Sequence, residues 1–104
     1  MGVVSLVYLA APYSHPDPMV VEERMITYCR VDSKLLTAGM MTISPLMKHY
    51  VLEHGDLLGD WGYWQNYAKL LLLKCDVICI ICMDGWKESE GVQAEIEIAK
   101  NLIS

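Results

Sequence analysis

The sequence predicts an α/β protein in which helices cover both faces of a small parallel sheet. Two nearly continuous apolar runs, 3–10 and 76–83, are typical of strands that are buried on both faces. A shorter strand is expected at 40–44, where Pro45 ends it. Segments with helical spacing of apolar residues follow each of the three strands. This alternation of strands and helices favours parallel pairing.

The helices can be placed from their apolar spacing and their end signals. The first is expected over 17–38, after a proline-containing loop, with Gly39 just beyond its end. Residues 46–62 are ambiguous and hold either a short helix near 46–53 or a hidden strand. A helix is expected over 61–74, and another from Ser89 to the end of the sequence.

Composition narrows the classes of function. The 104 residues suffice for one domain, 1–104, and 54% of them are hydrophobic, as in a folded globular protein. The net charge is −5 and there is no basic run, which argues against binding to a nucleic-acid duplex. No apolar stretch is long enough to predict a membrane span, and the apolar N-terminal run is interpreted as a strand rather than a signal peptide.

The four cysteines, Cys29, Cys75, Cys79 and Cys82, suggest neither a metal site nor a disulfide framework. Cys79 and Cys82 have CxxC spacing, but in a strand their side chains point to opposite faces. We therefore expect buried thiols in a reducing cytoplasm.

Glu95 is the most informative single residue. The apolar positions of the last helix form one stripe, and at 100° per residue Glu95 falls near the centre of it. An inward-facing carboxylate is costly unless it is paired, hydrogen-bonded or protonated, and such groups are often chemical tools. A salt bridge at the edge of the core is the structural alternative.

The loop before this helix has the composition of an anion site. Ser89 offers a hydroxyl, Gly91 allows close approach to the backbone, and free N–H groups at a helix start attract phosphate. The alternative is that Ser89 is only an N-cap. If the helix begins near Gly91, Glu95 lies about 6 Å further along its axis, which is comparable to the distance from the 5′-phosphate to the anomeric carbon of a sugar. A carboxylate at that point suits glycosidic chemistry.

Several motifs together resemble the nucleoside 2-deoxyribosyltransferase superfamily, above all its small branch that hydrolyses nucleoside 5′-monophosphates. They are Tyr8–Tyr13 (YLAAPY), Ser44-Pro45, Cys75-Asp76 and Ser89-x-Gly91-x-x-x-Glu95-x-x-x-Ala99. The resemblance implies a flavodoxin- or Rossmann-like three-layer α/β/α fold and cleavage of N-glycosidic bonds without a metal or cofactor. It implies that Glu95 is the nucleophile that takes the sugar covalently and that Tyr8 orients it. It also implies that Ser89, which stands where transferases of free nucleosides have an Asp, binds phosphate.

One departure from this family is serious. A second Asp usually lies eight residues before the Asp that opens the third strand, and here Ala68 has that place. The nearest polar substitutes are Asn66 and, from the loop, Asp60, and the candidates to protonate the leaving base are Asp60 and water.

The remaining candidates for substrate binding come from loops and helix starts. Ala10 and Pro12 belong to the motif that ends the first strand. Arg24 either reaches the phosphate or pairs with a nearby carboxylate (Glu22, Glu23 or Asp32). Ser14 and His15, on the first loop, either donate to the phosphate or are ordinary polar loop residues. Trp61 stacks on a base or packs, and His49 reads a base edge or is solvated. Trp86 either covers the site or packs against the sheet.

The sequence thus predicts an N-glycosidase, hydrolase or transferase, for a (deoxy)nucleoside 5′-monophosphate. Two alternatives stay open: a nucleotide-binding module that has lost turnover, and a hydrolase of a larger, NAD-like N-glycoside. A three-stranded sheet leaves exposed edges, which favours a homodimer or higher oligomer.

Overall fold

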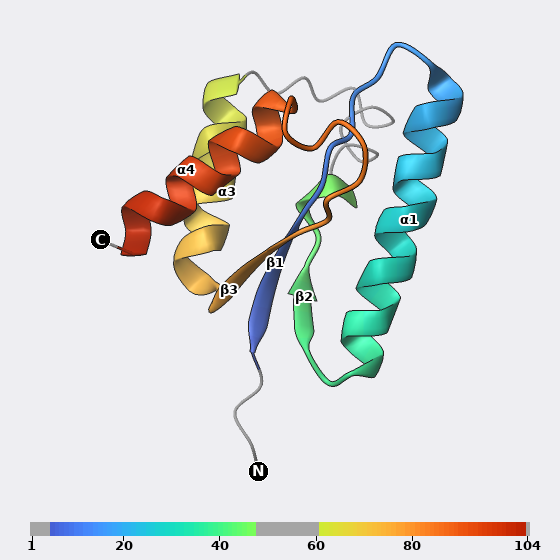
Figure 1. Cartoon of the computed structure of the whole chain (residues 1–104). Helices are drawn as coiled ribbons and strands as arrows, with labels where there is room; N and C mark the ends of the chain where they lie inside the picture. The colour runs from blue at the N-terminus through green and yellow to red at the C-terminus, as the bar shows by residue number, and fades with distance from the viewer. Residues whose placement is uncertain (1–4, 48–60, 104) are drawn as a thin grey trace.

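The computed structural model describes residues 5–47 and 61–103 and has the predicted three-layer α/β architecture (Figure 1). The order of elements is β1 (Leu6–Ala10), α1 (Pro18–Thr37), β2 (Met41–Ile43), a single 3₁₀ turn (Pro45–Met47), α3 (Trp61–Lys74), β3 (Val77–Ile80) and α4 (Glu90–Ile103). The predicted fold class is confirmed. The ambiguous segment starts with the 3₁₀ turn, and most of it, 48–60, lies outside the described residues.

The three strands are parallel and lie in the order β2-β1-β3. This is the start of the flavodoxin-like strand order 2-1-3-4-5. Tyr8, in the middle of β1, is paired with Ile43 of β2 and with Ile78 of β3. Because β1 has a neighbour on each side, its side chains are the most buried of the sheet.

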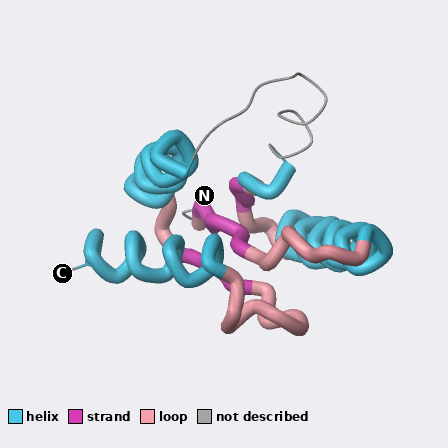
Figure 2. Tube along the Cα trace, turned by 90° about the horizontal axis from the view of Figure 1, so that it is seen from above, coloured by secondary structure: helices cyan, strands magenta, loops and turns pink. Residues whose placement is uncertain are grey.

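Helices cover the two faces of this sheet unequally. Tyr8 and Ala10 pack on one side with Ala68 and Leu72 of α3 and Ala99 of α4. On the other side, Leu9 packs with α1 and the 3₁₀ turn; the buried residues there are Leu9, Ala11, Met25, Tyr28 and Leu46. Seen from above, α1 lies on one side of the strands and α3 and α4 lie on the other (Figure 2). The alternation along β1 therefore sends Tyr8 towards α4.

The ends of α1 agree with the sequence signals. Asp17 is the N-cap, and its side chain accepts a hydrogen bond from the N–H of Met19 at 2.9 Å. Gly39 follows the C-cap with a φ of +93°, a left-handed conformation that glycine adopts without strain.

β3 differs from its prediction. It has four residues instead of eight, and it is an edge strand in which Val77 is 50% exposed. An apolar run does not reveal whether a strand is central or at an edge. Asp76 joins the start of β3 to β1, because its carboxylate accepts from the N–H of Leu6 at 2.7 Å and its own N–H donates to the carbonyl of Leu6 at 2.8 Å.

The expectation of buried thiols is wrong, because none of the four cysteines is fully buried. All four are free, but Cys29 and Cys82 are exposed, and Cys75 and Cys79 are half-buried. Cys29 lies on the outer surface of α1, and Cys82 follows the end of β3, so neither position is covered by another layer.

Candidate active site

A hydrogen bond between Tyr8 and Glu95 lies at the centre of the candidate site. The Tyr8 side chain, which is 1% exposed, projects from the central strand and donates its hydroxyl to Oε2 of Glu95. Val92 and Ala99, on the same stripe of α4, are buried, whereas Gln93, Glu97 and Lys100 are exposed. The prediction that Glu95 faces inward is confirmed, and its partner is a neutral hydroxyl group rather than a cation.

Burial dominates the electrostatics of this pair. It raises the pKa of Glu95 to about 7, although the hydrogen bond from Tyr8 acts in the opposite direction. Burial, together with the neighbouring carboxylate of Glu95, raises the pKa of Tyr8 far above its ordinary value. Tyr8 is therefore protonated at neutral pH and remains a hydrogen-bond donor, while Glu95 is divided between its two protonation states.

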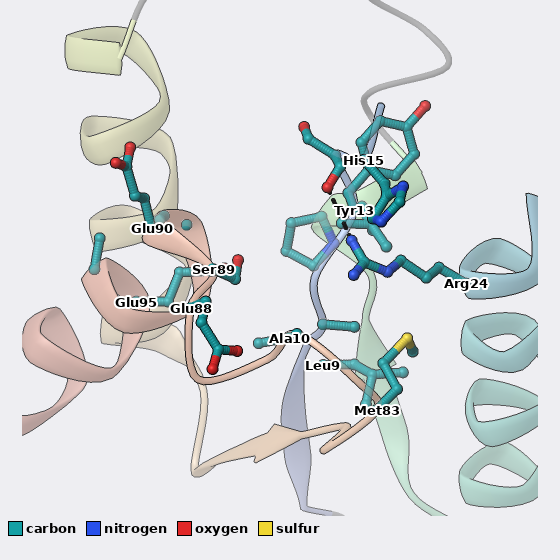
Figure 3. Close-up of a pocket in the computed structure, with 18 of the residues that line it drawn as sticks. Leu9, Ala10, Tyr13, His15, Arg24, Met83, Glu88, Ser89, Glu90 and Glu95 are labelled. Carbon is teal, nitrogen blue, oxygen red and sulfur yellow. Dashed lines mark hydrogen bonds between the residues drawn. The ribbon is translucent and has the colours of Figure 1, made fainter. Parts of the chain in front are cut away.

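A cavity of about 1140 Å³ opens in front of Glu95, at the carboxyl ends of the strands (Figure 3). This is where ligands bind in open parallel sheets. Its walls come from the end of β1, the first half of α1, the 3₁₀ turn, α3, and the loop that leads into α4. Ligand pockets commonly measure about 300–1,000 Å³, so this volume is sufficient for a nucleotide.

Ser89 caps the start of α4 and also lines the cavity, and its phosphate-binding role stays a prediction. As the N-cap of α4, its Oγ accepts from the N–H of Val92 at 3.2 Å, and it also lines the cavity. Because Oγ is the acceptor in this bond, its own O–H is available to donate. Gly91 lies beside Ser89 in the cavity wall, in the first turn of α4, whose N–H groups have no intrahelical acceptor.

Arg24 supplies positive charge on the opposite side of the cavity. Its guanidinium donates to the carbonyl oxygens of Ser14 at 2.9 Å and Asp84 at 3.0 Å, so it links the first loop to the loop before α4. In Figure 3 it points into the space between α1 and Ser89. Two of its five N–H groups are used in these two bonds.

The expected pairing of Arg24 with a carboxylate is not observed. In the described part of the chain, Arg24 forms no ion pair. Asp32, one of its suggested partners, instead accepts hydrogen bonds from Thr42 and Ser44 of the β2 region. The arginine is held by neutral carbonyl groups, and its charge remains available to a ligand.

Three further predicted binding residues lie in the cavity wall: Ala10, Ser14 and His15. Ala10 ends β1, and its small side chain leaves room above the sheet. His15 is exposed, and its Nδ1 accepts from the N–H of Asp17 at 3.0 Å. This hydrogen bond stabilises the loop that precedes α1.

Two predicted binding residues lie elsewhere. Pro12 is fully buried and is not part of the cavity wall, so it shapes the first loop from inside. Trp86 does not line the cavity either. The amine of Lys87 lies 5.8 Å from the centre of its ring, and its carbonyl accepts from the side chain of Gln93 at 3.5 Å. The substrate-binding roles suggested for these two residues stay predictions.

The predictions for Asp60 and His49 lie outside the described residues. Trp61 begins α3, but its side chain is not described. The stacking and proton-donor roles suggested for these residues stay predictions.

Sequence reasoning missed several cavity residues. On α3, Gln65 lies one turn before Ala68, and both face the cavity, so a carboxylate in place of Ala68 would point into the site. Asn66, the other suggested substitute, is exposed and does not line the cavity. Others are Tyr13, Glu23, Thr27, Asp84 and Glu88. Glu23 and Thr27 lie four residues apart on α1, next to Arg24, so helical spacing could have placed them on the same face as the arginine. The cavity residues in loops follow no periodic pattern, so the sequence could not identify them.

A family comparison covers nearly the whole chain. Residues 5–102 match the family described as "Domain of unknown function (DUF1937)", and the chain belongs to that family. No curated protein matches this sequence.

Two further properties concern the described residues, 5–47 and 61–103. None of their helices is long and apolar enough to cross a membrane. Within these ranges, no three side chains of His, Cys, Asp or Glu gather in a way that could hold a metal ion.

Proposed function

We propose that this protein cleaves the N-glycosidic bond of a nucleoside 5′-monophosphate, with Glu95 as the nucleophile. The observation that carries the proposal is the half-buried carboxylate of Glu95, which faces the cavity and accepts a hydrogen bond from Tyr8. A carboxylate in this setting can attack an anomeric carbon and stabilise an oxocarbenium-like transition state. The hydroxyl group of Tyr8 holds one carboxylate oxygen and leaves the other to react.

The 5′-phosphate of the substrate is assigned to the part of the cavity between Arg24 and the start of α4. Arg24 and Ser89 face each other across the cavity in Figure 3, and Gly91 contributes an N–H from the first turn of α4. A guanidinium, a hydroxyl group and a helix N-terminus are all groups that favour a phosphate. A phosphate held there leaves the sugar carbon C1′ near Glu95, four residues further along α4.

The reaction proceeds in two steps. In the first, an oxygen of Glu95 bonds to C1′ while the C1′–N bond breaks and the base leaves with a proton. In the second, water attacks C1′, gives up a proton, and releases the Glu95 carboxylate. This sequence requires no metal or organic cofactor.

Base release from a panel of nucleosides and their 5′-monophosphates tests the proposal. We expect free base from the monophosphates at a higher rate than from the nucleosides. Glu95→Gln should lower that rate by about three orders of magnitude or more, because an amide is a poor nucleophile. Glu97→Gln is the matched control, since Glu97 lies on the same helix with its side chain 69% exposed.

A covalent product provides the second readout. Rapid quenching followed by peptide mass analysis should find the sugar phosphate attached to the peptide that contains Glu95. Equal activity of the Glu95→Gln and Glu97→Gln proteins would contradict the proposal.

A nucleotide-binding module without turnover is the second candidate. The observation that favours it is Ala68, which lines the cavity at the position where the superfamily usually has an Asp. In that case a nucleoside monophosphate raises the melting temperature while no base is released.

A further inference from the structure

The proposed reaction needs a group that can transfer protons. The departing base takes up a proton in the first step, and the attacking water loses one in the second. The described wall of α3 offers only Gln65 and Ala68, neither of which ionises. Tyr8 is committed to Glu95 and keeps its own proton at neutral pH.

A second carboxylate is available on the loop that leads into α4. Glu88 lies one residue before the N-cap Ser89 and lines the same cavity as Glu95. In Figure 3 its carboxylate is turned towards Ala10, at the end of the central strand. Glu90, two residues later, also lines the cavity, but its carboxylate points in the opposite direction, away from Ala10.

The Glu88 carboxylate is also uncommitted. It forms no ion pair with any described side chain, and the amine of the adjacent Lys87 is placed over the ring of Trp86 instead. Glu88 is exposed, so water can reach its carboxylate.

We propose that Glu88 is the general acid and base of this site, an inference that rests on the proposed function. In the first step the carboxylic acid of Glu88 gives its proton to the base as the C1′–N bond breaks and Glu95 bonds to C1′. In the second step the Glu88 carboxylate takes a proton from water as the water oxygen bonds to C1′ and Glu95 departs. Each turnover consumes one water molecule and returns both carboxyl groups to their starting states.

Glu88→Gln and Glu90→Gln form a matched pair of variants. Each removes one negative charge next to the start of α4, and the two positions are two residues apart. We expect Glu88→Gln to lower the rate of base release by about 10²-fold or more, in the range typical of general acid–base catalysis. Glu90→Gln should remain within about threefold of the wild type. Melting temperatures of the two variants establish that both are folded.

Chemical rescue separates proton transfer from a structural role. Azide attacks a glycosyl–enzyme without first losing a proton, and a base that already carries a positive charge leaves without gaining one. With azide and the N-methylated, cationic form of the base that the wild type accepts, the Glu88→Gln protein should recover to within about tenfold of the wild type. It should also release the glycosyl azide, whereas Glu95→Gln should gain no activity from azide.

The outcomes distinguish this inference from the function on which it rests. If Glu95→Gln is inactive but Glu88→Gln behaves like Glu90→Gln, the inference is wrong and the proposed function stands. A Glu88→Gln defect that neither azide nor the cationic base relieves also overturns the inference, because the residue then acts structurally. If the wild type releases no base, both proposals fail.

Discussion

Glu95 has an environment that changes its chemistry without an ionic partner. Its carboxylate is half-buried between α4 and the central strand, and its hydrogen bond from Tyr8 offsets only part of the desolvation cost. The result is a pKa raised to about 7, so the charged, nucleophilic form becomes dominant only above neutral pH. Binding of a substrate that develops positive charge at C1′ favours this charged form.

The raised pKa of Glu95 predicts a particular dependence of stability on pH. Its ordinary value is 4.5, so between pH 4.5 and about 7 the native state binds more protons than the unfolded state. The contribution of Glu95 to the free energy of unfolding therefore decreases as pH rises through this window, and it is constant above and below it. The difference amounts to at most about 3 kcal/mol, at 1.36 kcal/mol for each unit of pKa.

Glu95→Gln should remove this dependence. Relative to the wild type, the variant should gain stability between pH 4 and pH 8, which thermal unfolding of both proteins at the two pH values measures. Glu97→Gln, with its exposed side chain, serves as the control and should follow the wild type. Parallel curves for the wild type and Glu95→Gln would show that Glu95 titrates normally.

For single residues, the sequence predicted which way the side chain of Glu95 points, but it did not predict the hydrogen-bond partners of Arg24. The 3.6-residue period placed Glu95 on the inner side of α4 because the orientation of a helical side chain is set locally. It did not identify the carbonyl partners of Arg24, which lie 10 and 60 residues away along the chain. Pro12 was suggested for the site from its position in a motif and Trp86 from its place in the loop before α4, but Pro12 is fully buried and the amine of Lys87 lies over the ring of Trp86.

Arg24 links two loops of the cavity wall, the loop after β1 and the loop before α4. The helix α1 holds this arginine between the carbonyls of Ser14 and Asp84. Gly85 makes room for it: a Cβ at this position would lie 2.6 Å from Nη2 of Arg24, and its φ is +90°. The loop before α4 therefore needs glycine both for its backbone and for the arginine.

Gly39 provides a natural control for Gly85. Its φ of +93° is nearly the same, but a Cβ at Gly39 would meet no atom within 4 Å. Alanine at either position should cost about 1–2 kcal/mol through the left-handed backbone. Only Gly85→Ala should also displace Arg24 and weaken nucleotide binding.

Calorimetric titration in the Glu95→Gln background measures this difference, because that background prevents turnover. We expect at least a tenfold loss of affinity for the nucleoside 5′-monophosphate in Gly85→Ala and little change in Gly39→Ala. Equal affinities would mean that Arg24 does not hold the phosphate.

The molecule as a whole exposes apolar surface outside the cavity. Leu70 and Leu73 of α3 are 64% and 54% exposed, and Val77 and Met41 are exposed on the two edge strands. Together with the two edge strands of the sheet that the described residues form, these side chains support the proposal that the protein forms a homo-oligomer.

Sedimentation velocity tests this proposal. We expect a mass above the 11.8 kDa of one chain, and the double variant Leu70→Lys/Leu73→Lys should shift the protein towards monomer. Leu36→Lys, at a 51% exposed position on α1, is the control. A wild type that sediments as a monomer over a wide range of concentration would contradict the prediction.

The sequence by itself determined the α/β class, the order of the elements, the helix bounds to within a residue and the inward orientation of Glu95. These properties follow from periodicity and end signals, which act over a few residues. The contact between Tyr8 and Glu95 was expected from the family resemblance, but only the tertiary structure decided that β1 is central, that Arg24 joins two loops and that Glu88 shares the cavity. These contacts join segments far apart in the chain, and they depend on how the layers pack rather than on any local pattern.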